Sequence, residues 1–273
     1  MSAQFASLFL NASEQPAVCQ VEPFDAPLAL FLARCAEAAY GYSPTSTPVQ
    51  EAALLGLQTT AFDCGPISGF VGYDDQRCVL SFAGTHDLAG WLDDANCTLV
   101  AQPPYPGHVH GGFACALESV WQTIESLLPN TRALYVTGHS LGGALASLAQ
   151  WRLTNQGRNV QACITFGEPR VGDAAWASAN QLPHCRVVHD CDPVPRVPFW
   201  PLYHHIGHMV WFDRFDRLNP DSTLWQRVVN WVEEDLDRVR DPWALRVVQL
   251  AQEHLISAYV AVLEKAAAQG NGI

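Results

Sequence analysis

The alternation of apolar and polar positions along the chain predicts both strands and helices. Residues 27–41 place apolar side chains on one helical face, with a proline in the first turn and a glycine at the end, which is typical of a helix. The segment after it is interpreted as a proline-rich loop. Residues 58–83 then show strand-type runs broken by turn residues, and 67–73 and 77–83 are predicted to pair as an antiparallel hairpin.

Further along the chain, short apolar segments alternate with helical ones. Continuous apolar runs predict buried strands at 133–137, 160–166 and 186–189. Helical spacing predicts helices at 113–128, 141–151 and 173–180. Because strands that alternate with helices form a mostly parallel sheet covered on both faces, the predicted fold class is α/β. Helices flank this central sheet, and the N-terminal hairpin adds an antiparallel portion.

The last third of the chain is predicted to be largely helical. Residues 214–241 are expected to form one or two helices, and 243–268, which lack glycine and proline, are expected to form one long helix. No internal repeat or low-complexity linker divides the chain. Since 273 residues suit one α/β domain, residues 1–273 are predicted to form a single domain.

Composition narrows the classes of partner. The net charge is -12, with 15 lysines and arginines against 27 acidic residues, which argues against nucleic-acid binding. No apolar run approaches the roughly 20 residues of a membrane helix, and no basic residue precedes the short apolar stretch at the N-terminus. We expect a soluble protein, cytoplasmic or exported without a cleaved signal peptide. Nine cysteines without C-x-x-C spacing suggest neither a disulfide framework nor a zinc site, and we expect no metal and no cofactor.

The candidate chemistry begins with Ser140, which lies between a predicted strand and a predicted helix. Gly138 and Gly142 stand two positions on either side, where a strained serine turn needs room. The following helix would direct backbone N–H groups toward a reacting carbonyl. The alternatives are a serine that only caps the helix, or a phosphate-binding loop, but the Gly-Lys-Ser/Thr ending of the latter is missing. The pattern therefore predicts a nucleophilic serine.

Four further motifs accompany the serine turn. The five stretches, in chain order, are Val79–Thr85, Val109–Phe113, Gly138–Gly143, Thr165–Gly172 and Asp192–Arg196. Together they resemble the class 3 lipases, the family of the fungal triacylglycerol lipases within the α/β-hydrolase fold, and Tyr203–Gly207 extends the match. Ala83 departs from the family pattern, in which arginine is usual.

The resemblance implies a serine carboxylic ester hydrolase, most simply a lipase that cleaves acylglycerols through an acyl-enzyme. A phospholipase, a leaderless lipase effector and an esterase of short acyl esters share every motif. A non-catalytic lipid-binding protein on the same fold is the alternative from a different class. The expected partner is a lipid or small ester substrate, including one at a lipid–water interface.

A serine nucleophile needs a histidine to accept its proton and a carboxylate to fix the histidine tautomer. In this fold the chain order is serine, acid, histidine. The resemblance implies Asp192 as the acid, and Asp190 is its competitor.

Chain order leaves four histidines as candidate bases: His204, His205, His208 and His254. The family has its base near the C-terminus ahead of an aromatic residue, which implies His254 followed by Tyr259. His205 is the runner-up. Because periodicity places His254 inside a long helix, the base assignment requires that helix to break near Gln252.

The oxyanion hole and the substrate-binding surface follow from the same comparison. The backbone N–H of Leu141, directly after the serine, is one expected oxyanion donor, and the resemblance implies Thr85 as the other. Leu88, Trp91 and Leu92 fall at helical spacing where the family holds a short amphipathic lid, although an ordinary surface helix would show the same stripe. Aromatic residues within 199–211 are interpreted as an acyl pocket or as core.

Overall fold

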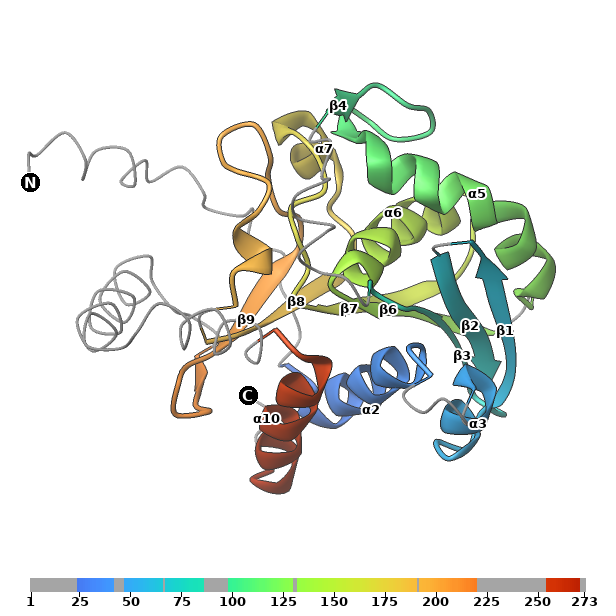
Figure 1. The fold of residues 1–273 in the computed structure, drawn as a ribbon, viewed down its shortest axis with the longest axis vertical. Helices are drawn as coiled ribbons and strands as arrows, with labels where there is room; N and C mark the ends of the chain where they lie inside the picture. Colours follow the sequence, from blue (N-terminus) through green and yellow to red (C-terminus); the bar gives the residue numbers. More distant parts are fainter. Residues whose placement is uncertain are drawn as a thin grey trace, which may run out of the picture.

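The computed structural model describes residues 24–41, 47–65, 67–85, 98–129, 132–190, 192–219 and 254–270. A twisted eight-stranded sheet runs through them in the order β1-β2-β3-β6-β7-β8-β9-β10 (Figure 1). Its strands are β1 (Gln58–Cys64), β2 (Ile67–Tyr73), β3 (Arg77–Phe82), β6 (Ala133–His139), β7 (Val160–Phe166), β8 (His184–His189), β9 (His208–Phe212) and β10 (Leu218–Asn219). Strands β3, β6, β7, β8 and β9 are parallel, and β1, β2 and β10 join antiparallel. The predicted α/β class with an antiparallel N-terminal portion is confirmed.

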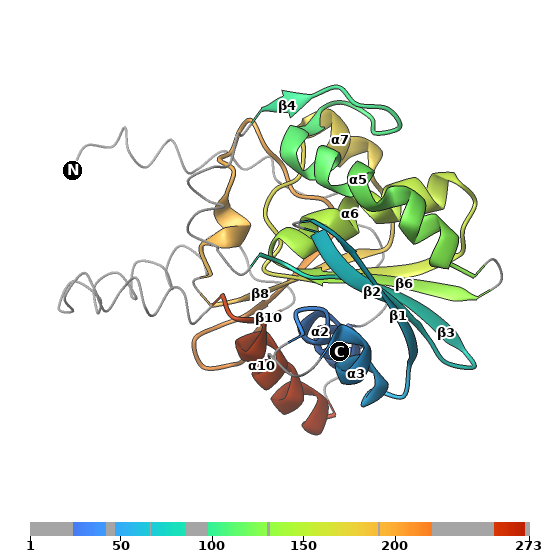
Figure 2. The same cartoon turned by 45° about the vertical axis from the view of Figure 1, so that its right-hand side comes forward.

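Helices cover both faces of this sheet (Figure 2). One face carries α5 (Gly111–Leu127), α6 (Leu141–Asn155) and α7 (Ala174–Ala179), and the other carries α2 (Ala26–Ala38), α3 (Pro48–Ala53) and α10 (Ile256–Ala268). On β3, Leu80 and Phe82 point into the core beneath α5 and α6, whereas Val79 points into the core that α2 and α10 share. Among the described residues, no helix combines the length and apolar character that crossing a membrane requires.

Smaller elements complete the described chain. The strands β4 (Leu99–Val100) and β5 (Val109–His110) pair antiparallel at the edge of the α5 layer. A single 3-10 turn, η1 (Val194–Arg196), follows β8. These short segments lie in loops at the ends of the central strands, where a parallel sheet presents its functional residues.

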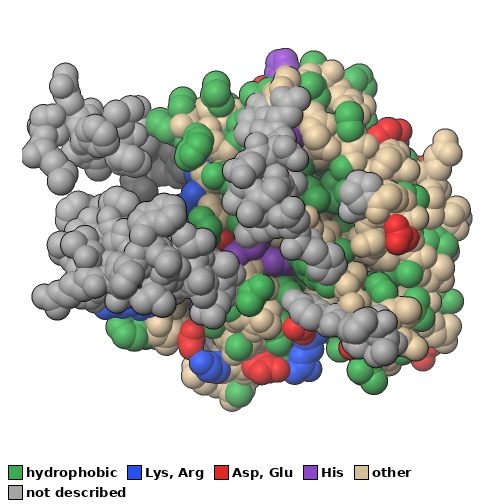
Figure 3. Space-filling view, viewed as in Figure 1, with side chains coloured by type: hydrophobic (Ala, Val, Ile, Leu, Met, Phe, Trp, Pro, Cys, Tyr) green, Lys and Arg blue, Asp and Glu red, His purple; other side chains and the backbone are tan. Residues whose placement is uncertain are grey.

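The helices α2 and α10 lie against each other under the sheet. Asp25 begins α2 by accepting a hydrogen bond from the N–H of Leu28 at 2.8 Å. Arg34 on α2 pairs with Glu264 on α10 at 2.8 Å, and charged side chains gather over these two helices in the space-filling view (Figure 3). Since an exposed ion pair contributes at most about 1 kcal/mol, the shared apolar face holds α10 in place.

The prediction of a proline-rich loop after the first helix is wrong for Pro48–Ala53, which form α3. The Thr47 side chain accepts from the N–H of Gln50, and the Gln50 side chain accepts from the N–H of Thr47 at 2.9 Å. This is a capping box with proline at the first helical position. Pro48, which contributed to the loop prediction, is the first residue of the helix, and the Thr-Pro-x-Gln spacing of residues 47–50 encodes this helix start.

The prediction of one long helix over 243–268 is also wrong at its centre. Helix α10 begins at Ile256, Leu255 is extended with φ -64° and ψ 136°, and His254 lies in a turn. The carbonyl of His254 accepts a hydrogen bond from the side chain of His139, so a tertiary contact has replaced the helical one. Residues 220–253 lie outside the described residues, and 214–219 form a turn and β10 rather than a helix.

A buried polar cluster joins β7, β8 and α6 behind the serine turn. The Thr165 hydroxyl donates to Glu168 at 2.5 Å, and Nε2 of His184 lies 2.8 Å from the same carboxylate oxygen. The other ring nitrogen of His184 lies 2.8 Å from the amide oxygen of Gln150, whose amide nitrogen donates to the Pro183 carbonyl. Because the side chains of Thr165, Glu168, His184 and Gln150 are all buried, each depends on its neighbours for a partner.

Replacing Glu168 by alanine should therefore lower the free energy of unfolding by about 3 kcal/mol, since it strands two buried donors. Glu168→Gln should lower it by less than half as much, because the amide oxygen still accepts a hydrogen bond. Urea unfolding followed by circular dichroism measures both. Equal losses in the two variants would show that the cluster is not held by this acceptor.

Candidate active site

Ser140 occupies the turn between β6 and α6 with φ 58° and ψ -128°. Few residues with side chains adopt such a backbone, and it persists only where the surroundings enforce it. The N–H of Ser140 donates to the carbonyl of Phe166 on β7 at 2.9 Å. A Cβ on Gly138 would lie 2.2 Å from the carbonyl oxygen of Gly142, and one on Gly142 would lie 2.4 Å from that of Phe82. The two glycines therefore allow the close approach that holds the serine in this turn.

Asp192 and His254 form a buried pair at the end of β8 and the start of α10. Nδ1 of His254 lies 2.9 and 2.8 Å from the two carboxylate oxygens of Asp192. The N–H of Val194 and the hydroxyl of Tyr259 donate to the same carboxylate. Because the carboxylate accepts, Nδ1 of His254 carries the proton, and Nε2 is left as the acceptor.

Ser140 and His254 are both buried. Neither Oγ of Ser140 nor Nε2 of His254 has a hydrogen-bond partner among the described residues. The ring of His139, the residue before the serine, packs against the ring of His254 with centroids 4.5 Å apart. Buried polar atoms without partners are rare, and such bonds in enzymes often form only when substrate is bound. A hydroxyl donor and an imidazole acceptor are thus both buried without a partner among the described residues.

Gly167 forms part of the wall around the pair. It follows β7 with φ 58°, and a Cβ there would lie 2.7 Å from Oδ2 of Asp192 and 3.0 Å from Cε1 of His254. In the sequence, Gly167 stands out only as part of the motif at 165–172. The position requires glycine for two reasons: its φ is positive, and a Cβ would clash with the acid–histidine pair.

The competing acid and base lie elsewhere. Asp190 sits in the turn after β8 with φ 43°, and Nε2 of His205 donates to the carbonyl of Pro195 at 2.7 Å. Burial, and then the charge of Arg186, hold the pKa of His205 well below its ordinary value. Within the described part of the chain, no hydrogen bond joins Asp190 to a histidine or His205 to a carboxylate. The structure brings Asp192 and His254 together instead.

The expected oxyanion donors flank the serine turn. Leu141 is the first residue of α6, so its N–H lies at the positive end of a 15-residue helix. A Cβ on Gly84 would lie 2.8 Å from the carbonyl oxygen of His139 and 2.1 Å from the hydroxyl of Tyr40. The chain leaving β3 therefore presses against the serine turn, and Thr85 is the next residue.

The described residues include only some of those predicted to bind substrate. The lid residues named above, Leu88, Trp91 and Leu92, lie outside the described residues. In the aromatic segment, Tyr203 and Trp211 are core residues, whereas Phe199 is 76% exposed and Leu202 is 68% exposed. The segment is therefore divided between core and surface.

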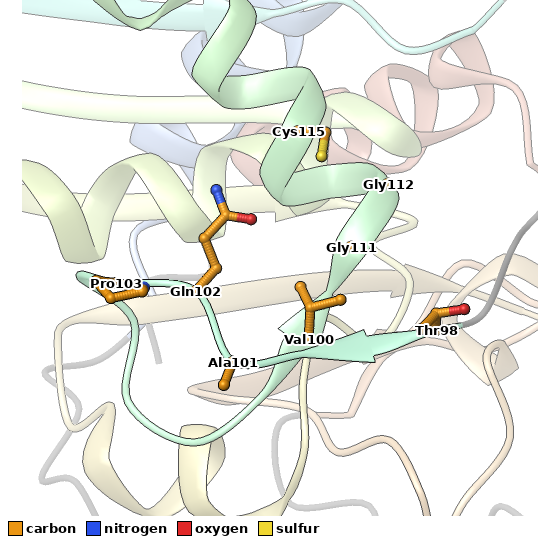
Figure 4. Close-up of a pocket in the computed structure, with 8 residues that line it drawn as sticks. All are labelled: Thr98, Val100, Ala101, Gln102, Pro103, Gly111, Gly112 and Cys115. Atoms are coloured by element: carbon orange, nitrogen blue, oxygen red, sulfur yellow. The ribbon is translucent and has the colours of Figure 1, made fainter.

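A separate hollow of about 500 Å³ lies between the β4 strand, the loop after it and the start of α5 (Figure 4). Its lining includes Val100, Gln102 and Cys115 and no charged side chain. None of the residues around Ser140, Asp192 or His254 lines it. Its chemistry does not extend that of the serine site.

Two side chains that contact the site have no role in the sequence analysis. The Tyr40 hydroxyl lies 2.6 Å from Nδ1 of His139, and Nε2 of His139 lies 2.6 Å from the carbonyl oxygen of His254. These partners are 99 and 115 residues apart, so no local spacing signals them. Tyr259 is expected only as the aromatic that follows the base, and its hydroxyl bonds Asp192.

The parallel sheet, the serine turn at the carboxyl end of a central strand and the buried acid–histidine pair define an α/β-hydrolase-type protein. Residues 79–202 match the family model described as Lipase (class 3). The resemblance to class 3 lipases is confirmed.

Individual relatives agree. The chain is 35% identical over 170 residues to a lipase of Caenorhabditis elegans, covering 56% of this chain and 48% of the relative. It is 33% identical over 166 residues to secreted mono- and diacylglycerol lipase 1 of Fusarium solani, covering 54% and 48%. The chain thus spans about half the length of these relatives.

Solved structures show the same fold. The Rhizomucor miehei triacylglyceride lipase superposes with a TM-score of 0.60 at 21% identity, covering 75% of this chain and 94% of that one. The Lip2 lipase of Yarrowia lipolytica also gives a TM-score of 0.60, at 24% identity, with 70% and 81% coverage.

Gly167→Ala should displace the acid–histidine pair, and Gly157→Ala is its matched control. Gly157 also has a positive φ, 77°, but nothing lies within 4 Å of a Cβ there. Both changes introduce backbone strain of about 1 kcal/mol, and only the first adds the contacts. The low-field proton NMR signal of Nδ1–H of His254 should be lost or shifted in Gly167→Ala and unchanged in Gly157→Ala. Identical spectra for the two variants would contradict the contact.

Proposed function

We propose that the chain is a serine carboxylic ester hydrolase in which Ser140 is the nucleophile, His254 the base and Asp192 the acid. One observation carries the proposal: both oxygens of Asp192 contact Nδ1 of His254, and Nε2 is then the nitrogen able to accept a proton. The strained backbone of Ser140 also supports the proposal, because it matches the geometry in which a nucleophile elbow holds its serine.

The reaction follows from these roles. Oγ of Ser140 attacks the ester carbonyl while Nε2 of His254 accepts the hydroxyl proton, and Asp192 stabilises the resulting imidazolium. The N–H groups of Leu141 and Thr85 would bind the oxyanion, each contributing about 3 kcal/mol. The imidazolium then protonates the leaving alkoxide, so the alcohol departs and an acyl-serine remains. Water, deprotonated by Nε2, then attacks the acyl carbonyl, the bond to Oγ breaks, and the imidazolium returns its proton to Oγ, so that the carboxylic acid leaves and Ser140 is regenerated.

We further propose that acylglycerols are the substrate, approached at a lipid–water interface. The Fusarium relative is named a mono- and diacylglycerol lipase, and the Rhizomucor structure is that of a triacylglyceride lipase. Exposed Phe199 and Leu202, and half-exposed Leu255 beside the base, support contact with lipid. A phospholipase, a short-ester esterase and a leaderless lipase effector remain variants of this chemistry. The assembled acid–histidine pair favours an enzyme over a non-catalytic lipid-binding protein.

His254→Ala should lower kcat/KM for p-nitrophenyl butyrate by about 10⁴-fold or more, because the serine loses its base. His205→Ala is the matched control, since it removes another, partly buried histidine, and it should stay within tenfold of wild type while folded. Circular dichroism establishes folding for both. Activity retained in His254→Ala and lost in His205→Ala would move the base to His205.

The substrate class is decided by comparing tributyrin and triolein emulsions, diacylglycerol, phosphatidylcholine vesicles and p-nitrophenyl acetate with the same enzyme. Fatty acid release from the glycerides should exceed release from the phospholipid. Turnover of phospholipid alone would refute the acylglycerol assignment, and turnover of the acetate alone would indicate a short-ester esterase. A folded protein that hydrolyses none of them would favour the lipid-binding alternative.

A further inference from the structure

His139, the residue directly before the serine, contacts both the main chain and the ring of the base. It is buried, its Nε2 lies 2.6 Å from the main-chain carbonyl oxygen of His254, and the two imidazole rings pack at a centroid distance of 4.5 Å. The rings of Tyr259 and Tyr40 also contact it, each with centroids 5.8 Å away. One residue therefore links the nucleophile and the base through a covalent neighbour and a hydrogen bond.

The partners of His139 determine its tautomer. A carbonyl oxygen can only accept, so Nε2 of His139 must carry the proton, and Nδ1 must then be the acceptor. The Tyr40 hydroxyl, 2.6 Å from Nδ1, supplies the matching donor. In the opposite tautomer the lone pair of Nε2 would face the carbonyl oxygen of His254 at 2.6 Å, and two acceptors at that distance repel each other. Tyr40 thus sets the tautomer of His139, as Asp192 sets that of His254, although the protonated nitrogen is Nε2 in His139 and Nδ1 in His254.

The charge of His139 matters as well. During proton transfer His254 becomes an imidazolium, and a second imidazolium packed against it would oppose that step. Burial, followed by the neighbouring His254, lowers the pKa of His139 well below its ordinary value. The titratable groups that face it in the described structure are Tyr40, His254 and Tyr259, and none is a carboxylate that would favour its protonation.

The carbonyl contact also accounts for the break before α10. Helix α10 begins at Ile256 with no side-chain cap, and the main chain of His254 turns its carbonyl toward β6. The contact orients the loop that carries the base, while Asp192 orients only the ring. Both constraints are needed to define the position of Nε2.

We propose that His139, kept in its neutral Nε2–H tautomer by Tyr40, is a positioning residue that fixes the main chain of His254 relative to Ser140. The proposal rests on the proposed function. It predicts that losing either the His139 donor or the Tyr40 hydroxyl lowers the rate of the chemical step without weakening substrate binding.

Four variants test it: Tyr40→Phe, His139→Leu, His139→Gln and the control Tyr135→Phe, which removes a hydroxyl from β6 itself, four residues before His139. Tyr40→Phe should lower kcat about tenfold and His139→Leu about 100-fold, with KM within twofold of wild type. His139→Gln keeps an N–H donor and should recover at least half of the loss on a logarithmic scale. Tyr135→Phe should match wild type.

Nitrogen-15 NMR of the His139 ring provides a readout that does not depend on turnover. Wild type should show the neutral Nε2–H tautomer between pH 5 and 8, and Tyr40→Phe should show a mixed or titrating ring. The Nδ1–H signal of His254 should shift in Tyr40→Phe and His139→Leu and stay in place in Tyr135→Phe.

The outcomes separate the two proposals. An unchanged kcat in folded Tyr40→Phe and His139→Leu, or a loss that appears only in KM, overturns the positioning role. If wild type hydrolyses no ester, the proposed function fails, and the two NMR readouts alone decide the placement. A His139 ring that is cationic, or that is the Nδ1–H tautomer in wild type, overturns the inference in either case.

Discussion

The close contact between the end of β6 and the start of α6 is the constraint on which the site depends. At Gly138 and Gly142 the strand and the helix approach so closely that a Cβ would clash with backbone atoms. Ser140, between these two glycines, is held with a positive φ. This strained conformation is stabilised by the hydrogen bond from the Ser140 N–H to the Phe166 carbonyl and by the strands paired on both sides of β6. The same approach presses the chain leaving β3 against the turn, which is where the first residue after Gly84 could face a reacting carbonyl.

The patterns that act over a few residues predict much of this structure. Buried parallel strands, the helices between them and the serine turn are encoded in local runs, and each appears within a few residues of its predicted bounds. Helix α3 could also be predicted, because its capping box is a local signal, but the prolines in this segment favoured the interpretation as a loop. Periodicity alone does not predict the break before α10, because the sequence favours helix there. Only the assignment of His254 as base required a break, near Gln252, and the structure has a non-helical turn at 254–255, where the bond from His139 to His254 lies. Contacts between residues more than 90 positions apart leave no trace in spacing.

The site also shows how one residue type takes different roles. His254 has a carboxylate at Nδ1 and an unoccupied acceptor at Nε2, which suits proton transfer. His139 has the Tyr40 hydroxyl at Nδ1 and a carbonyl at Nε2, which matches the neutral Nε2–H tautomer, and His184 lies between a carboxylate and an amide in the cluster behind the turn. Sequence alone ranks such histidines only by order along the chain. Their neighbours, such as Tyr40 after α2, Asp192 after β8 and Gln150 on α6, decide what each can do.

The claim that Ser140 is a nucleophile activated by His254 and Asp192 is tested most directly by covalent labelling. A fluorophosphonate reacts with a serine only when a neighbouring base increases its nucleophilicity. Peptide mapping by mass spectrometry should locate one adduct per chain, on Ser140, in wild type, and labelling should be nearly abolished in folded His254→Ala. An adduct on another residue, or no adduct in folded wild type, would contradict the account.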